Sequence, residues 1–344
     1  MSAPPGFVDP LQGHPRYRTI KYVNKGSFGF VVLAENLETH EQVAIKFVEV
    51  SSDSDVKHSH REIMNHQSLL HPHVVQLKEV MAVPPYLAIV MEYVSGGDMF
   101  QYVVQRRGLP EAEARWFFQQ LILGMDYCHR KGVASRDIKL ENTLLVLQPD
   151  KKPLLKLCDF GYSKHELLDS VAKSKVGTPG YTSPEVISNS HGYDGKRADI
   201  WSAGVMLFTM LFARYPFERP EDKRLRPNER LQKVLRRIVR VDYEFPESVP
   251  VSDSCKDLLR RILVADPARR ASIADIQAHP WFRQDLPPGS LEYNDWALNL
   301  AVQPAQSSED VHAVIEAARA SLERARRAPP KEVSDADADV ETYG

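Results

Sequence analysis

Residues 137–142 bring together three side-chain types that suit phosphoryl transfer. Asp137 supplies a carboxylate that would orient and deprotonate an acceptor hydroxyl, Lys139 a cation for the transferred phosphate, and Asn142 an amide oxygen for Mg²⁺. Phosphoryl transfer needs little covalent help, but it needs charge compensation and a base beside the acceptor. This spacing therefore predicts a catalytic loop for that chemistry.

A second motif, Asp159-Phe160-Gly161, follows after two strand-like segments. Its carboxylate, Asp159, would hold a Mg²⁺ that bridges the phosphates. A lone tripeptide of this kind is more simply an ordinary turn. Two motifs at this separation, each flanked by apolar runs, argue against that simpler interpretation.

Two upstream features would hold the phosphates. Gly26 and Gly29 lie between strand-like runs and would let the backbone approach phosphate oxygens. Lys46 lies inside an apolar strand-like run, residues 43–48, where it needs an anion, and Glu62 on the next helix would pair with it. Taken alone, the glycine loop is as readily a hairpin turn, and Lys46 as readily a lysine at a sheet edge.

Short β-branched runs dominate from residue 17 to about 93 and predict a small antiparallel sheet, with one helix at about 58–70. Gly96 and Gly97 mark a hinge, after which helical periodicity dominates, notably at 111–131 and 200–211. We therefore expect an α+β fold with an N-lobe at 17–94 and a C-lobe at 95–283. Residues 1–16 are expected to be disordered, and residues 284–344 to form a tail with a helix at about 307–327 and an acidic end.

The composition excludes several classes of protein. The 344 residues carry 44 basic and 46 acidic side chains, so the net charge of −2 indicates neither a nucleic-acid nor a membrane partner. Cys128, Cys158 and Cys255 are too far apart for a disulfide framework and fit a reducing compartment. The sequence predicts no leader and no membrane span. We expect a monomer in the cytoplasm, with the nucleus open as a second location.

The motifs, in their order, resemble the protein-kinase signature set. The resemblance covers about residues 17–283, and Lys139 with Gly177-Thr178-Pro179 matches serine/threonine kinases. It implies a two-lobed kinase fold that uses ATP and Mg²⁺ to phosphorylate proteins. It also implies that Asp199 braces the catalytic loop and that Arg270 pairs with Glu185.

A closer resemblance lies in segments such as LAIVMEYVSGGDMF, KLENTLL and KVGTPGYTSPEV. They are similar to the plant sucrose-non-fermenting-related protein kinases of the second subclass, kinases of osmotic-stress and abscisic-acid signalling. This resemblance implies a green-lineage source, an upstream kinase and a phosphatase. It also implies activation by phosphorylation of Ser174, whose phosphate would meet Arg136.

The same resemblance assigns further residues. Asp98 and Glu141 would face a basic residue three positions before the acceptor, and Thr178 would support the catalytic loop beside the substrate. The nucleotide would contact the following residues: Asn24, Gly26, Gly29, Val31, Ala44, Lys46, Met91, Glu92, Val94 and Leu144.

Two positions depart from the family pattern. Asn24 replaces the first glycine of the phosphate loop, and Ser135 replaces the histidine before Arg136. These changes leave open a weakly active or pseudokinase-like signalling scaffold. A small-molecule kinase is a further alternative, although the complete segment around Thr178 disfavours it because the family uses that segment to dock peptides.

The tail helix predicted at about 307–327 begins at Ser307, whose spacing to Asp310 imitates a capping box. Its apolar residues then fall on one face: Val311, Val314, Ile315, Ala318 and Leu322. By resemblance to the plant subclass, this face would dock on the N-lobe helix that bears Glu62. A solvated helix that touches nothing is the alternative.

Overall fold

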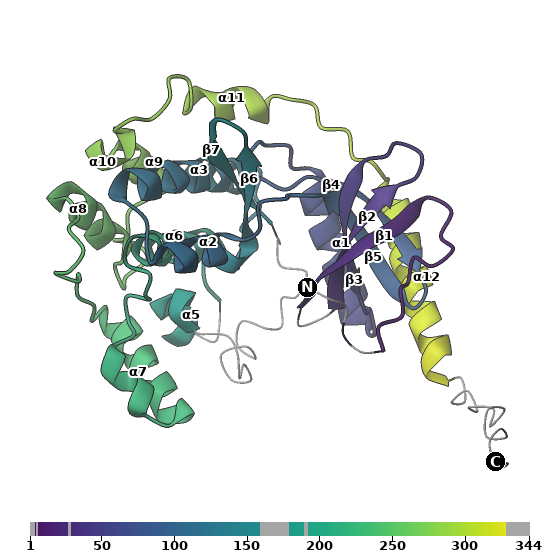
Figure 1. Cartoon of the computed structure of the whole chain (residues 1–344), viewed down its shortest axis with the longest axis horizontal. Helices are drawn as coiled ribbons and strands as arrows, with labels where there is room; N and C mark the ends of the chain where they lie inside the picture. The colour runs from purple at the N-terminus through teal and green to yellow at the C-terminus, as the bar shows by residue number, and fades with distance from the viewer. Residues whose placement is uncertain (1–3, 5, 27–28, 159–178, 189–191, 328–344) are drawn as a thin grey trace, which may run out of the picture.

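The computed structural model describes residue 4 and residues 6–26, 29–158, 179–188 and 192–327. Figure 1 shows a smaller lobe built on a sheet and a larger helical lobe. The N-lobe sheet is antiparallel, in the order β1-β2-β3-β5-β4. The predicted α+β, two-lobed arrangement is therefore confirmed. The N-lobe elements are β1 (Tyr17–Gly26), β2 (Gly29–Asn36), β3 (Gln42–Val48), α1 (Asp53–Gln67), β4 (Leu77–Val83) and β5 (Tyr86–Glu92).

The α1 helix begins five residues before the predicted start at His58. Ser52 is its N-cap: the Ser52 side chain accepts from the backbone N–H of Asp55, and the Asp55 carboxylate accepts from that of Ser52. This capping box holds the polar first turn in helical form, although that turn lacks an apolar stripe. The sequence estimate followed the stripe and so missed the start.

The C-lobe is mainly helical, with a two-stranded sheet beside the cleft. Its elements are α2 (Met99–Arg106), α3 (Glu111–Arg130), η1 (Leu140–Asn142), β6 (Thr143–Gln148), β7 (Lys151–Leu157), η2 (Pro179–Tyr181), α5 (Pro184–Ser188), α6 (Gly195–Phe212), η3 (Pro220–Arg224), α7 (Pro227–Arg240), α8 (Asp253–Ile262), α9 (Ile273–Ala278), α10 (Pro280–Arg283) and α11 (Glu292–Leu298). The last helix, α12 (Ser308–Arg327), returns to the N-lobe (Figure 1). None of the helices in the described part of the chain has the length and apolar character needed to cross a membrane.

The C-lobe core forms around α6, which packs against α3 and α8. Residues 198–212 of α6 are buried almost throughout, as expected for a helix that is apolar on every side. Trp201 stacks on Phe217 with ring centroids 5.5 Å apart. This core fixes Asp199, at the start of the buried stretch, as a rigid support for the catalytic loop.

Two histidines, the buried His71 and the half-buried His73, lie where the segment between α1 and β4 meets the C-lobe. His71 stacks on Tyr127 of α3 at 4.9 Å between ring centroids. Its Nδ1 accepts from the backbone N–H of His73, so its Nε2–H donates to Asn294 of α11 at 2.9 Å. Asn294 in turn donates to the Leu123 carbonyl and to the Asp126 carboxylate. The α11 helix is thereby pinned to the back of the C-lobe.

Burial keeps both imidazoles neutral. Desolvation, with the charge of a neighbouring group, lowers the pKa of His71 to about 3 and that of His73 to about 4. In the unfolded chain both titrate near their ordinary value of about 6.5. Their contribution to stability is therefore fully present above pH 6.5 and is lost progressively as the pH falls below it.

The free energy of unfolding should fall by about 1 kcal/mol per buried histidine between pH 7.5 and 5.5, because only the unfolded chain takes up these protons. Chemical denaturation at several pH values measures this slope. The His73→Gln variant should show a shallower slope, and His40→Gln, at an exposed position, should retain that of the wild type. Identical slopes in all three proteins would contradict the assignment.

Candidate active site

The catalytic loop brings its three predicted polar residues into direct contact. Lys139 Nζ donates to Asp137 Oδ2 at 2.8 Å, and the Asn142 amide donates to the same oxygen at 2.6 Å. The amide also donates to the Asp137 carbonyl at 3.1 Å. Because both partners are acceptors, Asn142 must present its NH₂ to Asp137, and its carbonyl oxygen is left for another ligand. A carboxylate, a cation and an amide oxygen thus share one small volume.

A single buried carboxylate supports this loop from beneath. Asp199, 1% exposed, accepts from the backbone N–H groups of Ser135 at 2.9 Å and Arg136 at 2.7 Å, and from His129 Nε2 at 2.8 Å. Arg136 itself has a left-handed backbone with a φ of 62°. A non-glycine residue keeps that conformation only where its surroundings fix it. The bonds to Asp199 supply that constraint immediately before Asp137.

The departure at Ser135 leaves this brace intact. Ser135 is 7% exposed, and its bond to Asp199 comes from the backbone N–H rather than from the side chain. Any residue except proline would donate that bond. The replacement of the family histidine therefore removes an aromatic ring from the loop and keeps the interaction that positions it.

The sheet register gathers half of the predicted nucleotide-contacting residues on one face. Val31 of β2 lies opposite Lys46 of β3, which lies opposite Ile89 of β5. Paired residues in antiparallel strands point to the same side, and so do residues two positions along. The face of β2, β3 and β5 that carries Lys46 therefore carries the following predicted residues: Gly29, Val31, Ala44 and Met91.

Gly29 is fixed by packing as well as by any contact with phosphate. A Cβ at this position would lie 1.7 Å from the carbonyl oxygen of Phe47 on β3. Only glycine fits where β2 approaches β3 so closely. Asn24 is exposed on β1 opposite Val31, and Gly26 pairs with Gly29, while residues 27–28 at the tip lie outside the described residues. Contacts of this loop with a nucleotide stay predictions.

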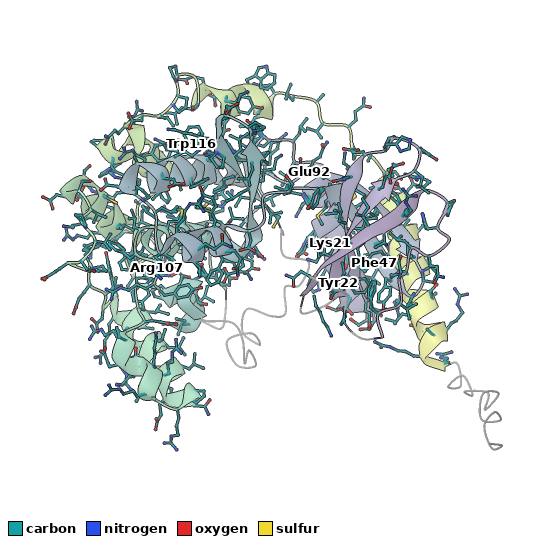
Figure 2. All side chains as sticks on the ribbon, in the orientation of Figure 1. Lys21, Tyr22, Phe47, Glu92, Arg107 and Trp116 are labelled. Atoms are coloured by element: carbon teal, nitrogen blue, oxygen red, sulfur yellow. The ribbon has the colours of Figure 1, made fainter. Side chains whose placement is uncertain are left out.

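The hinge connects both lobes through Glu92 (Figure 2). The Glu92 carboxylate accepts from Lys156 Nζ of β7 at 2.7 Å and from the backbone N–H of Gln76 at 2.8 Å. The Glu92 side chain is thus occupied, and the contacts of residues 92–94 with a nucleotide stay predictions. Leu144 of β6 packs on the N-lobe apolar cluster that contains Met91 and Val94. The lobes therefore meet where the adenine ring is predicted to lie.

The predicted substrate acids meet beside the catalytic loop. Asp98 caps α2 by accepting from the backbone N–H of Gln101 at 2.8 Å, and it bridges to Leu144. Glu141 as a whole residue is exposed to solvent. The protein around its carboxylate nevertheless desolvates that group, which raises its pKa. The negative charges of Asp137 and Asp98 raise that pKa further, and Lys139 opposes them. Two acidic groups thus lie near the predicted base, and their role toward a substrate stays a prediction.

A further family expectation concerns Arg270 and Glu185, which form a two-fold hydrogen-bonded ion pair. Both bonds from the Arg270 guanidinium to the Glu185 carboxylate measure 2.8 Å, and the arginine side chain is fully buried. This geometry is the strong, bidentate form of the pair. The pair that the resemblance implied is therefore present, and it fixes α5 to the C-lobe.

Lys46 and Glu62 occupy the N-lobe side of the cleft. Lys46 is half-buried on β3, and Glu62 is 6% exposed on α1. The ion pair between them stays a prediction. Asp159, Ser174 and Thr178 lie outside the described residues, so their predicted roles stay predictions as well. Within the described part, no group of three or more His, Cys, Asp or Glu side chains forms a metal site.

The tail helix packs on the helix that carries Glu62. The buried face of α12 joins the N-lobe cluster beneath α1, β4 and β5 through Val311, Ile315 and Ala318. Polar contacts surround this face: Arg319 pairs with Asp53 of α1, and His60 bonds to the Ser308 carbonyl at 3.0 Å. The structure thus places the apolar stripe against α1, as the sequence analysis expected, with β4 and β5 as further partners.

Gln306, two residues before α12, also covers an edge of the N-lobe sheet. β4 is one of the two edge strands of the N-lobe sheet, and the Gln306 side chain bonds to both backbone groups of Val80, accepting at 2.7 Å and donating at 3.0 Å. An amide side chain here imitates one residue of a neighbouring strand, which protects an edge. The sequence analysis missed this contact because a lone glutamine before a helix carries no pattern.

The comparisons with known proteins agree with this geometry. A family model described as the protein kinase domain matches residues 17–282. The chain belongs to the protein kinase family. It is 45% identical to serine/threonine-protein kinase SRK2A of Physcomitrium patens, over 91% of this chain and 87% of that protein. It is 46% identical to SAPK1 of Oryza sativa subsp. japonica, over 88% and 87%.

These relatives belong to the plant subclass that the sequence resembles, so the predicted family and the serine/threonine class are confirmed. A solved crystal structure, that of Rad53 1–466 in complex with AMP-PNP, has a TM-score of 0.64 and 27% identity. The match covers 78% of this kinase and 65% of that chain, just under two thirds. It supports the two-lobed kinase fold.

Removal of α12 should destabilise this kinase and lower its activity. Burying each large apolar side chain contributes about 1.5–3 kcal/mol, so truncation after Leu300 should lower the melting temperature by at least about 5 °C. Truncation after Lys331 retains α12 and should change neither property. Thermal denaturation and a phosphotransfer assay measure both.

A matched pair of point variants separates docking from the mere presence of the helix. Ile315→Asp places a charge in the buried face and should reproduce the truncation, whereas Ala313→Asp places the same charge at an exposed position of α12. Equal melting temperatures for the two variants would show that α12 does not brace the N-lobe.

Proposed function

We propose that this kinase transfers the γ-phosphoryl group of ATP to serine and threonine hydroxyls of proteins, in plant-type stress signalling. The observation that carries the proposal is the contact of Asp137, Lys139 and Asn142 on a loop braced by Asp199. The ATP analogue in the Rad53 complex and the names of the relatives support it.

In this mechanism the acceptor hydroxyl donates a hydrogen bond to the Asp137 carboxylate, which takes its proton as the oxygen attacks the γ-phosphorus. The bond from that phosphorus to the bridging oxygen breaks, and ADP leaves. Lys139, 2.8 Å from that carboxylate, lies beside the charge that develops on the transferred group. Lys46 holds the phosphates from the N-lobe side, and Glu62 orients Lys46. The residues of β2, β3 and β5 enclose the adenine.

The donors present fit Mg²⁺. The Asn142 carbonyl oxygen, left over once the amide N–H groups bond to Asp137, is the kind of hard ligand that this ion takes. Asn142 and Asp159 would hold it, and bound Mg²⁺ would neutralise phosphate charge. The role of Asn142 toward Asp137 is therefore to fix both the base and a metal ligand with one side chain.

A pseudokinase-like scaffold is the second candidate, because Asn24 and Ser135 depart from the family pattern. The brace argues against it, since Ser135 keeps its backbone bond to Asp199. Conversion of Asp137 to Asn should reduce phosphotransfer to a generic basic peptide by at least about 10²-fold. ATP affinity should stay unchanged, because the base does not touch the nucleotide.

Asp150→Asn is the matched control, since it makes the same substitution in the exposed turn between β6 and β7. A radiolabelled ATP assay measures transfer, and calorimetry measures nucleotide binding. Undetectable transfer by the wild type with ATP still bound would favour the scaffold. Wild-type turnover in Asp137→Asn would overturn the mechanism.

We further propose that phosphate on Ser174 activates the enzyme through Arg136. The Nε atom of Arg136 is buried and has no hydrogen-bond partner within the described residues. A Cβ on Gly195 would lie 2.8 Å from that atom, so Gly195 makes room for the guanidinium at the start of α6. A phosphate adds about −1.5 to −2 charges and strong acceptors, which would satisfy this group.

Ser174→Ala should therefore lower activity substantially, and Arg136→Gln should have little additional effect in that background, because the two groups act as a pair. Ser170→Ala is the neighbouring control and should retain activity. Mass spectrometry of the active enzyme identifies the modified serine. Full activity in Ser174→Ala with Ser174 unmodified in active enzyme would refute the pairing.

The remaining expectations belong to the same proposal. Asp98 and Glu141 favour substrates with a basic residue three positions before the acceptor, and Thr178 supports the catalytic loop. An upstream kinase and a phosphatase control Ser174. The protein acts as a monomer in the cytoplasm, with the nucleus as a second location.

A further inference from the structure

The segment that precedes β1 packs on the N-lobe sheet. Its Leu11 side chain is 2% exposed and belongs to an apolar cluster of that sheet. The Asp9 carboxylate accepts from the backbone N–H of Leu11 at 3.0 Å and from the Thr19 hydroxyl of β1 at 2.7 Å. The sequence analysis expected disorder for residues 1–16. Residues 6–16 depart from that expectation, because a buried leucine and a bonded carboxylate anchor them to the sheet.

Phe7 brings an aromatic ring from this segment onto the hairpin that carries the glycine loop. The ring meets that of Tyr22 of β1 (Figure 2) edge to face, with centroids 5.1 Å apart and planes at 74°. It meets Phe30 of β2 in the same way, at 5.3 Å and 90°. Edge-to-face contact is a favourable arrangement of aromatic rings. One side chain from outside the sheet thus joins both strands of the hairpin.

The pairing of these two strands is interrupted beside the ring of Phe7. The register of β1 against β2 shifts between Tyr22, which lies opposite Val32, and Asn24, which lies opposite Val31. Such a shift leaves a residue of one strand out of the ladder and disrupts the hydrogen bonding locally. Asn24 is also the position where the family glycine is replaced. The ring therefore connects the strands next to a point where their ladder does not.

Phe30 relates this packing to the predicted nucleotide contacts. It lies between Gly29 and Val31 in β2, and successive side chains of a strand point to opposite faces of the sheet. Its ring is therefore on the face away from Lys46, where it stacks on Phe47 of β3 with centroids 5.0 Å apart. Rings on one face thus fix the strand whose other face carries predicted nucleotide contacts.

We propose that Phe7 is a positioning residue for ATP: by joining Tyr22 to Phe30, it holds the strands that flank the glycine loop in the arrangement that receives the phosphates. The proposal rests on the proposed function, since ATP is the ligand proposed there. Confining a glycine-containing loop when a ligand binds costs conformational entropy. Flanking strands that are fixed in advance lower that cost.

The role of Phe7 should therefore appear in nucleotide affinity and not in the chemical step. In Phe7→Ala, Kd for ATP should rise at least about threefold, because aromatic contacts are each worth about twofold to tenfold in an equilibrium constant. KM for ATP should rise with it, while kcat at saturating ATP and KM for the peptide stay near those of the wild type. Calorimetry and steady-state kinetics measure these values. Phe7→Tyr retains the ring and should behave like the wild type.

Hydrogen exchange tests the same role without nucleotide. In Phe7→Ala, the backbone amides of residues 22–32 should exchange faster than in the wild type, because the hairpin opens more readily. Val8→Ala is the neighbouring control, since Val8 is 77% exposed, and it should change neither exchange nor Kd. Phe30→Leu removes the partner ring, and Phe7→Ala should add little in its background.

A second control separates positioning from general stability. Val83 of β4 is 4% exposed and belongs to the same apolar cluster as Leu11. Val83→Ala should lower the melting temperature and leave Kd for ATP near that of the wild type. Unchanged Kd or unchanged exchange in Phe7→Ala would overturn the proposal. So would a loss of ATP affinity in Val83→Ala equal to that in Phe7→Ala.

Binding measured apart from turnover separates this proposal from the proposed function. If neither the wild type nor Phe7→Ala transfers phosphate, but the variant binds ATP more weakly than the wild type, the proposed catalytic function fails and the role of Phe7 stands. If the wild type transfers phosphate and the two proteins bind ATP equally, only the role of Phe7 fails.

Discussion

The buried carboxylate of Asp199 is the interaction on which the rest of the site depends. It accepts three hydrogen bonds, two of them from consecutive backbone N–H groups, and a charged acceptor makes each of them strong. The left-handed backbone at Arg136 is tolerable only because of these bonds, and it turns the chain so that Asp137 meets Lys139 and Asn142. Because Asp199 lies in α6, where residues 198–212 are buried almost throughout, the packing of the core determines the geometry of the catalytic loop.

Much of this arrangement could be predicted from the sequence because its signals are local. The identities of Asp137, Asn142 and Lys46 follow from what phosphoryl transfer needs, and the alternation of apolar residues predicts the strands that carry Lys46. The pairing register of the strands then places Val31, Ala44 and Met91 on the same face of the sheet as Lys46. The sequence does not reveal the pairing register of the strands, but it identifies the residues whose relative positions depend on that register.

What the sequence could not show depends on contacts between distant segments. The bond of Gln306 to Val80 joins residues 226 positions apart, and that of His71 to Asn294 joins residues 223 apart. Neither side chain belongs to a motif. The early start of α1 was missed for a different reason. Its capping box is a local signal, but the first turn of the helix carries no apolar stripe.

The tail runs from the C-lobe back to the N-lobe, so the two lobes are connected both by the hinge and by the tail. The α11 helix is pinned to the C-lobe by Asn294, and Gln306 with α12 is pinned to the N-lobe, so residues 299–305 form a second connection beside the hinge (Figure 1). Seven residues reach at most about 24 Å when fully extended. Any pivot at the hinge must keep the two anchors within that reach. The tail therefore acts as a tether of limited length. It restricts how far the two lobes can separate, while it permits small rotations of one lobe relative to the other.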